Sequence, residues 1–123
     1  MEKDKDIQWI GSSRKDLTAM PDAVKAEFGH GLYLAQTGER HAKAKTLTGY
    51  EGAIELIEDH DGDTYRAVYT TKIDDYVYVL HCFQKKSTNG IGLPKHDAET
   101  IKIRLKAATR ASEEKRNEQK KGM

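Results

Sequence analysis

The sequence has little of several residue types, and each shortage excludes a class of protein. It has one cysteine among 123 residues, so no disulfide can form within the chain, which fits a reducing compartment. No run of apolar residues is long enough for a signal peptide or a membrane span. We therefore expect a soluble, cytoplasmic protein that needs no membrane partner.

The chain also lacks an excess of charge of either sign. Charged residues make up 33% of it, yet the net charge is only +1. Overall charge therefore does not indicate nucleic-acid binding, and any basic surface must come from local segregation. The length fits one domain, which we assign to residues 1–110. Residues 111–123 contain almost no apolar side chains, so we expect a charged tail that is a frayed helix or disordered.

The apolar periodicity predicts seven elements in the order β-α-α-β-β-β-α. The expected elements are a strand at 6–11, helices at 12–20 and 21–38, strands at 52–59, 64–71 and 76–84, and a helix from His96. Tight turns make the three consecutive strands an antiparallel meander. This order predicts an α+β fold in which the helices pack on one face of a small antiparallel sheet. The other face would be free for solvent or a ligand.

One arginine, Arg66, interrupts an otherwise neutral strand. Alternation of side chains places it on one face with Thr64, Val68 and Thr70. An arginine in a strand must be solvated or paired with an acid. Arg66 is therefore either an ordinary surface charge or part of a site.

Basic residues follow the expected strands in two segments of the chain. No acid separates Asp75 from Asp97, and none lies between Arg40 and Tyr50. We expect a basic patch from these segments, formed with Arg66 by Arg40, Lys43, Lys45, Lys85, Lys86 and Lys95. We expect the acids to gather at one end of the meander; they are Glu58, Asp59, Asp61, Asp63, Asp74 and Asp75. Such segregation is typical of a polyanion site, although lysines that end a strand also serve to prevent sheet aggregation.

The remaining reactive residue types show no strong pattern. The five histidines lack metal-ligand spacing, so no metal is expected. His81 lies in an apolar strand and is interpreted as a core residue. His96 opens the last helix and is the better general acid or base by its expected exposure. Cys82 has no activating partner, so we expect a structural thiol.

Four segments of the chain resemble a known protein family. They are "IQWIGSSRKDLTAMP", "GDTYRAVY", "VYVLHCFQKKS" and the P-K-H-D start of the last helix. Together they are similar to the phage Gp49-like branch of the RelE/ParE toxin superfamily, a group that includes HigB-like toxins. The resemblance covers roughly residues 5 to 110 in matching order.

The resemblance implies the toxin of a type II toxin–antitoxin system. RelE-like and HigB-like members of the superfamily cleave mRNA in the ribosomal decoding site, and the implied reaction is attack of a ribose 2′-hydroxyl on its own 3′ phosphate, without a metal or cofactor. The implied partners are the ribosome, mRNA and a cognate antitoxin with a helix-turn-helix DNA-binding domain. Operator DNA would be bound only through the antitoxin.

The resemblance also assigns roles to individual residues. Arg66 stands where the family's strand arginine contacts the scissile phosphate. Lys85 and Lys86 stand where a basic pair supports catalysis. The further RNA contacts expected from proximity are Lys43, Lys45, Tyr50 and Lys95. No His or Tyr follows His96 in this sequence, so the general acid and base must come from His96, Lys85, Lys86 or Tyr50.

Two other functions fit the same fold. The superfamily includes gyrase poisons, so the chain could be a toxin that binds gyrase or another protein and has no nuclease activity. It could also be a non-toxic phage remnant that co-represses an operon with a DNA-binding partner.

Overall fold

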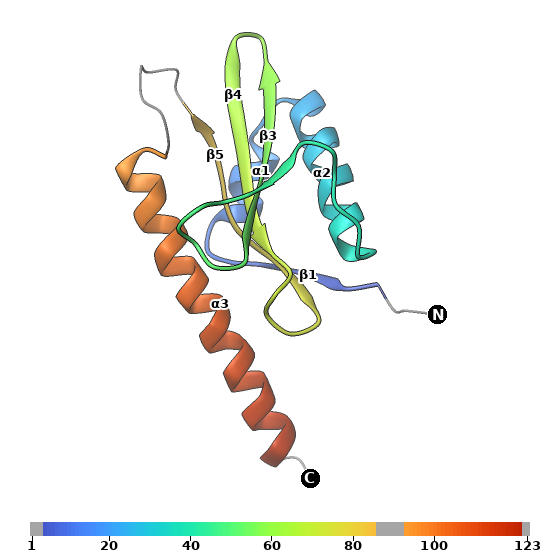
Figure 1. The fold of residues 1–123 in the computed structure, drawn as a ribbon, viewed down its shortest axis with the longest axis vertical. Coiled ribbons are helices and arrows are strands. Elements are labelled where there is room, and N and C mark those ends of the chain that lie inside the picture. Colours follow the sequence, from blue (N-terminus) through green and yellow to red (C-terminus); the bar gives the residue numbers. More distant parts are fainter. Residues whose placement is uncertain (1–3, 86–92, 122–123) are drawn as a thin grey trace.

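The computed structural model describes residues 4–85 and 93–121. Over these residues the chain forms three helices and one five-stranded sheet, which confirms the predicted α+β fold (Figure 1). The elements are β1 (Asp6–Trp9), α1 (Ser13–Thr18), α2 (Asp22–Gln36), β2 (Ala44–Thr46), β3 (Ala53–His60), β4 (Asp63–Thr70), β5 (Tyr76–Lys85) and α3 (Lys95–Lys121). None of the described helices has the length and apolar character that a membrane span requires.

The strands lie in the order β1-β5-β4-β3-β2. β3, β4 and β5 form the predicted antiparallel meander. β1 pairs in parallel with the first residues of β5, which makes the sheet mixed rather than wholly antiparallel. The three-residue strand β2 lies in a segment expected to be a plain connection, and it pairs antiparallel with β3.

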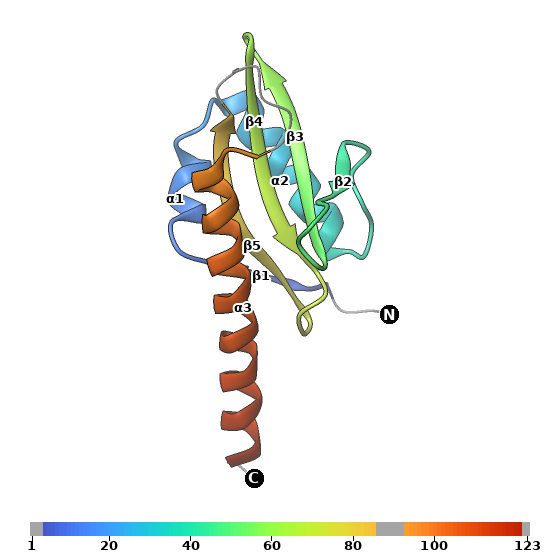
Figure 2. The same cartoon turned by 60° about the vertical axis from the view of Figure 1, so that its left-hand side comes forward.

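Helices cover both faces of the sheet, so the expectation of one free face is wrong. Phe28 and Leu32 of α2 pack against one face, in a cluster that includes Tyr69 of β4. Ile101 of α3 packs in a second cluster with Val68 of the same strand (Figure 2). Successive side chains of β4 point to opposite faces, and Val68 and Tyr69 are both fully buried, so side chains are covered on each face of the sheet.

The last helix continues beyond the predicted domain boundary. α3 runs through Lys121 and Ser112 is fully buried, so the segment expected to be a frayed or disordered tail begins as a continuation of the packed helix. The Ser112 hydroxyl donates a hydrogen bond to Asp74 in the β4–β5 turn. Lys115 lies 4.2 Å from the centre of the Tyr76 ring, a cation–π contact. These contacts hold the middle of α3 against the end of the sheet.

A β-bulge divides β5 into two halves. Val68 lies opposite His81, whereas the next residue, Tyr69, lies opposite Val79. Leu80 is therefore an extra residue in β5. As a result, the successive residues Leu80 and His81 both face α3, where Leu80 joins the apolar cluster and His81 binds Asp97.

The two glycines in the middle of α2 should respond oppositely to alanine. At Gly29 an added Cβ would meet nothing within 4 Å, so Gly29→Ala should raise the free energy of unfolding by about 0.5–1 kcal/mol. At Gly31 the Cβ would lie 2.7 Å from a methyl group of Leu56, which is buried, so Gly31→Ala should lower it by about 1 kcal/mol. Urea unfolding of both variants tests this, and equal shifts would contradict the packing described.

Candidate functional site

Arg66 forms a nearly buried ion pair with Glu55 on the α3 side of the sheet. Its Nη1 donates a hydrogen bond to Oε2 of Glu55 at 2.9 Å, and the side chains are only 14% and 11% exposed. Arg66 lies opposite Ile57, and Glu55 lies opposite Val68, so the two charged residues are diagonal neighbours on β4 and β3. The strand arginine is thus paired rather than solvated.

Arg66 also keeps a hydrogen-bond donor that the fold does not use. Its Nε is buried and has no hydrogen-bond partner among the described residues. An unpaired buried donor costs about 1–3 kcal/mol. Nε and Nη2 form the fork with which a guanidinium binds a phosphate or carboxylate through two hydrogen bonds. Glu55 occupies Nη1, so a phosphate that reached the fork would satisfy Nε without displacing Glu55.

Two of the predicted lysines share this face of the sheet. Lys45 of β2 lies opposite Glu55, and Lys85 lies opposite Thr64, two residues before Arg66. Cross-strand neighbours point to the same face. Lys45 and Lys85 therefore flank the Arg66–Glu55 pair from the neighbouring strands.

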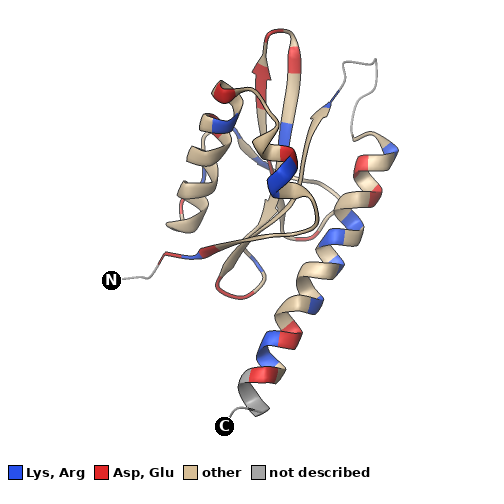
Figure 3. Cartoon of the chain, turned by 180° about the vertical axis from the view of Figure 1, so that it is seen from behind, with Lys and Arg blue, Asp and Glu red and all other residues tan. Residues whose placement is uncertain are grey.

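Lys43 does not contribute a separate cation to the predicted basic patch. It forms an ion pair with Glu58 at 2.8 Å, and that hydrogen bond raises the pKa of Lys43. The acids also do not gather at one end of the meander, as we expected. Figure 3 shows them at the β3–β4 hairpin and, at the opposite end of the sheet, in the β4–β5 turn. Charge is therefore balanced by local pairs rather than segregated over the whole sheet.

His81 is a buried residue whose two ring nitrogens are both engaged. Arg104 of α3 donates from Nη1 to His81 Nδ1 at 3.3 Å, and a guanidinium has no acceptor. Nδ1 must therefore accept, so Nε2 carries the proton and donates to Asp97 at 2.7 Å. Burial lowers the pKa of His81, although the hydrogen bond with Asp97 opposes this shift. The interpretation of His81 as a core residue with satisfied partners is confirmed.

Three predicted residues lie in the first turn of α3 or contact it. The Tyr50 hydroxyl donates to the backbone oxygen of Ala98 in α3 at 3.4 Å. Lys95 and His96 are exposed in the first turn of the same helix. Lys86, predicted to act with Lys85, lies outside the described residues.

Cys82 is a buried thiol on the other side of β5. It is 1% exposed, and burial raises its pKa to about 12. The thiol is therefore protonated at neutral pH and a poor nucleophile. This agrees with the predicted structural role.

Glu55 is the residue that the sequence reasoning missed. The signal was present, because the Asp-Gly turn after β3 indicates a tight hairpin and therefore a pairing register. That register puts Glu55 on the same face as Arg66, and Ile54 and Leu56 on the other. Reading β3 for its apolar face alone left its charged face unassigned.

The Arg66–Glu55 pair generates a prediction about stability. Arg66→Ala leaves a buried carboxylate without its partner, so it should lower the free energy of unfolding by about 3 kcal/mol. The double variant Glu55→Gln/Arg66→Met removes both charges and should lose far less. Urea denaturation of both variants measures the difference. Equal losses would mean that the pair is not energetically coupled.

The buried His81 generates a prediction about pH. Its folded pKa lies below the ordinary value of 6.5, so the unfolded chain takes up the proton first as pH falls. The stability due to neutral His81 should be present above about pH 6.5 and lost as pH falls through the folded pKa. Urea unfolding between about pH 7 and pH 5 should show this loss, and His81→Gln should reduce the slope. An NMR titration midpoint for His81 above 6.5 would contradict it.

Comparison with known proteins places the chain in a family. A family model described as "Phage derived protein Gp49-like (DUF891)" matches residues 15–106, a segment that runs from α1 into α3 and contains Glu55, Arg66 and His81. No curated protein sequence matches the chain. The Gp49-like family is associated with the toxins of toxin–antitoxin systems. Since the match covers most of the chain, this protein belongs to the phage-derived Gp49-like family.

Proposed function

We propose that this protein is the toxin of a type II toxin–antitoxin pair, and that it cleaves mRNA on the ribosome without a metal ion. The observation that carries the proposal is the nearly buried Arg66–Glu55 pair with its unused Nε donor. The association of the Gp49-like family with such toxins supports it independently.

A buried ion pair is poor support for stability, because desolvation of the two charges offsets much of their attraction. Apolar residues at the positions of Arg66 and Glu55 would stabilise the strand pair at least as well, so the presence of the ion pair favours a chemical role. The pair combines a cation that can hold a phosphate with a carboxylate that can accept a proton. Phosphodiester cleavage by a neighbouring hydroxyl needs both groups, close together.

In the proposed reaction the substrate phosphate binds the unused Nε and Nη2 side of the Arg66 guanidinium, which must become accessible when the RNA binds. Glu55 takes the proton from the ribose 2′-hydroxyl, and the 2′-oxygen attacks the adjacent phosphorus. The bond from phosphorus to the 5′-oxygen of the next nucleotide breaks. The products are a 2′,3′-cyclic phosphate and a 5′-hydroxyl, and Arg66 stabilises the charge that develops on the phosphate in between.

The 5′-oxygen must receive a proton as it leaves. His81 is unsuited to this step, because a neutral imidazole whose Nε2 proton is already donated in a hydrogen bond to Asp97 is a poor acid. We assign the donor to the residues at the rim of the same face, Lys85, His96 or Tyr50; Lys86 stays a candidate by its sequence position. Lys45 and Lys95 would contact flanking phosphates.

We infer the partners from the same proposal. A helix-turn-helix antitoxin would neutralise the toxin and carry it to operator DNA, and the ribosome would present the mRNA in the cytoplasm. The acceptance of a single-stranded mRNA by a sheet face fits the way proteins generally read unpaired RNA.

Primer extension on a reporter mRNA tests the reaction. Glu55→Gln keeps the shape of the side chain but removes the base, so it should slow cleavage by about 10²- to 10⁴-fold. Arg66→Lys keeps the charge but loses the fork, and should also cleave slowly. Arg110→Ala removes an exposed arginine elsewhere on α3 and should cleave like the wild type.

The same experiment is run with translation active and with translation blocked. Cuts that need translation and end in a 2′,3′-cyclic phosphate support the proposal. Intact mRNA in cells whose growth stops would instead indicate another target, and cleavage by Glu55→Gln at the wild-type rate would remove Glu55 from the mechanism.

A further inference from the structure

β5 has an edge that no described strand covers along its second half. β1 pairs only with Tyr76 to Val79, and the chain then turns into α1. Beyond Val79, the carbonyl of Leu80 accepts from Arg104 rather than from a strand. From His81 onward, this side of β5 faces a hollow instead of a neighbouring strand within the described residues.

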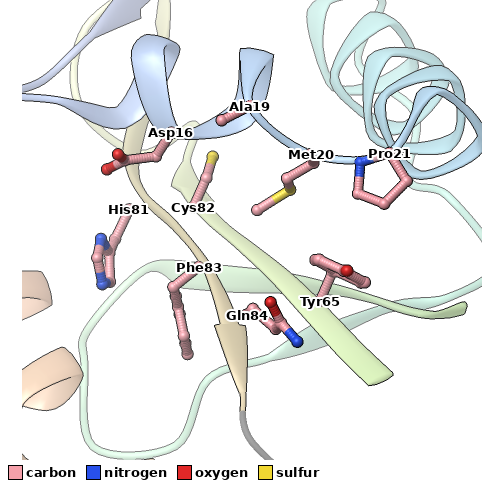
Figure 4. Close-up of a pocket in the computed structure, with 9 residues that line it drawn as sticks. All are labelled: Asp16, Ala19, Met20, Pro21, Tyr65, His81, Cys82, Phe83 and Gln84. Carbon is pink, nitrogen blue, oxygen red and sulfur yellow. The ribbon is translucent and has the colours of Figure 1, made fainter. Parts of the chain in front are cut away.

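The hollow is a pocket of about 390 Å³ between α1, the start of α2 and the β4–β5 pair (Figure 4). This volume lies within the range of small-ligand sites. Met20 and Tyr65 supply apolar and aromatic lining on the α2 side of the sheet, Phe83 lines the pocket from the α3 side of β5, and Asp16 and Gln84 supply polar groups. Cys82 adds an uncharged side chain, since its thiol is protonated.

The pocket lies beside β5, the strand next to the one that holds Arg66. Phe83 lines it and lies opposite Arg66 in the strand register. His81 also lines it, and its ring stacks on Phe83 at 4.6 Å between centres with an angle of 16°. A phosphate on Arg66 would therefore lie one strand away from the pocket.

The lining matches the chemistry of a nucleobase. Flat aromatic and apolar walls accept the faces of a base, and a few polar groups bind its edge. Asp16 is held in place by a hydrogen bond from the Ser12 hydroxyl to its Oδ2 at 2.7 Å. A carboxylate only accepts hydrogen bonds, so it selects a base edge rich in N–H donors. Guanine presents two such groups side by side, at N1 and N2.

We propose that this pocket is a subsite for one nucleobase of the RNA, with guanine preferred because of Asp16. The inference rests on the proposed function for its substrate class. It assigns to Asp16 and Gln84 the choice of nucleotide beside the cleaved bond. Arg66 and Glu55 would act on any sequence, so the pocket would carry the preference.

NMR of the wild-type protein with guanosine 5′-monophosphate tests the subsite without requiring cleavage. The amide signals of Cys82 and Gln84 should shift with this nucleotide. Ribose 5-phosphate, which has the same phosphate and sugar but no base, should not shift them. Equal shifts with the two compounds would overturn the proposal.

A matched pair of variants locates the binding. Ala19 is exposed and lines the pocket, so Ala19→Phe should fill it and weaken nucleotide binding by about tenfold or more, as expected when a stacked base is displaced. Ala26 is exposed on α2 outside the pocket, and Ala26→Phe should bind like the wild type. Gln84 is also exposed and lines the pocket, so Gln84→Ala should weaken nucleotide binding as well.

The outcomes separate this inference from the proposed nuclease activity. Base-dependent shifts in a protein that leaves mRNA intact would support the subsite and remove the nuclease. Cleavage of mRNA with no base-dependent shift, or with unchanged binding in Ala19→Phe, would overturn the subsite and leave the nuclease standing.

Discussion

The polar contacts of Arg104 join the helix on one face of the sheet to the sheet itself and to the start of α1. The guanidinium of Arg104 binds the Leu80 carbonyl at 3.0 Å and the Ser12 hydroxyl at 2.9 Å, and so joins α3, β5 and the start of α1. Gly11 makes room for it, because a Cβ there would lie 2.8 Å from Nε of Arg104 and the backbone φ is +58°. Apolar burial alone is non-directional. The hydrogen bonds of Arg104 therefore add directional contacts to the apolar packing of Ile101 and Ala108 on the sheet, and they lie beside the hydrogen bond between His81 and Asp97.

The candidate site follows the same rule of pairing each buried charge. Arg66 donates a hydrogen bond to Glu55 on the neighbouring strand, and Asp97 accepts a hydrogen bond from His81 Nε2. The charges of Arg66, Glu55 and Asp97 are therefore all paired and largely buried, and none of them attracts a ligand over a long distance. Binding at this face must instead satisfy donors that the fold leaves unused, such as Nε of Arg66. Recognition of that kind depends on close fit more than on net charge, which agrees with the small net charge of the chain.

Local signals in the sequence were enough to predict the meander and the faces of its strands. Asp61 and Gly62 both have positive φ in the β3–β4 turn, as the Asp-Gly pair indicated. The parallel pairing of β1 with β5 brings together residues about 70 positions apart, and no local pattern reports such a contact. The placement of α3 was missed for a related reason. A helical repeat shows which side of a helix is apolar but not which face of a sheet it covers.

The same limit explains the errors about the site. Counting charges along the chain predicted a basic patch, but Lys43 finds its partner at Glu58, on the adjacent strand. Glu55 could have been predicted from the hairpin register. The partners of His81 could not, because they lie on α3 and because the bulge in β5 changes the alternation just before His81. Strict alternation from the first half of β5 would place His81 on the opposite face.

That bulge has a consequence for how the protein can vary. The bulge shifts the alternation of side chains between two parts of one strand. In residues 76–79, which pair with β1, the even-numbered side chains face α3; in residues 81–85 the odd-numbered ones do, on the face that holds Arg66. Deletion of Leu80 would remove the extra residue and restore strict alternation, and every other side chain of β5 would keep its present face. β5 can therefore lose the bulge without turning Phe83 away from Arg66. What such a deletion removes is the apolar contact that Leu80 makes in the cluster beneath α3.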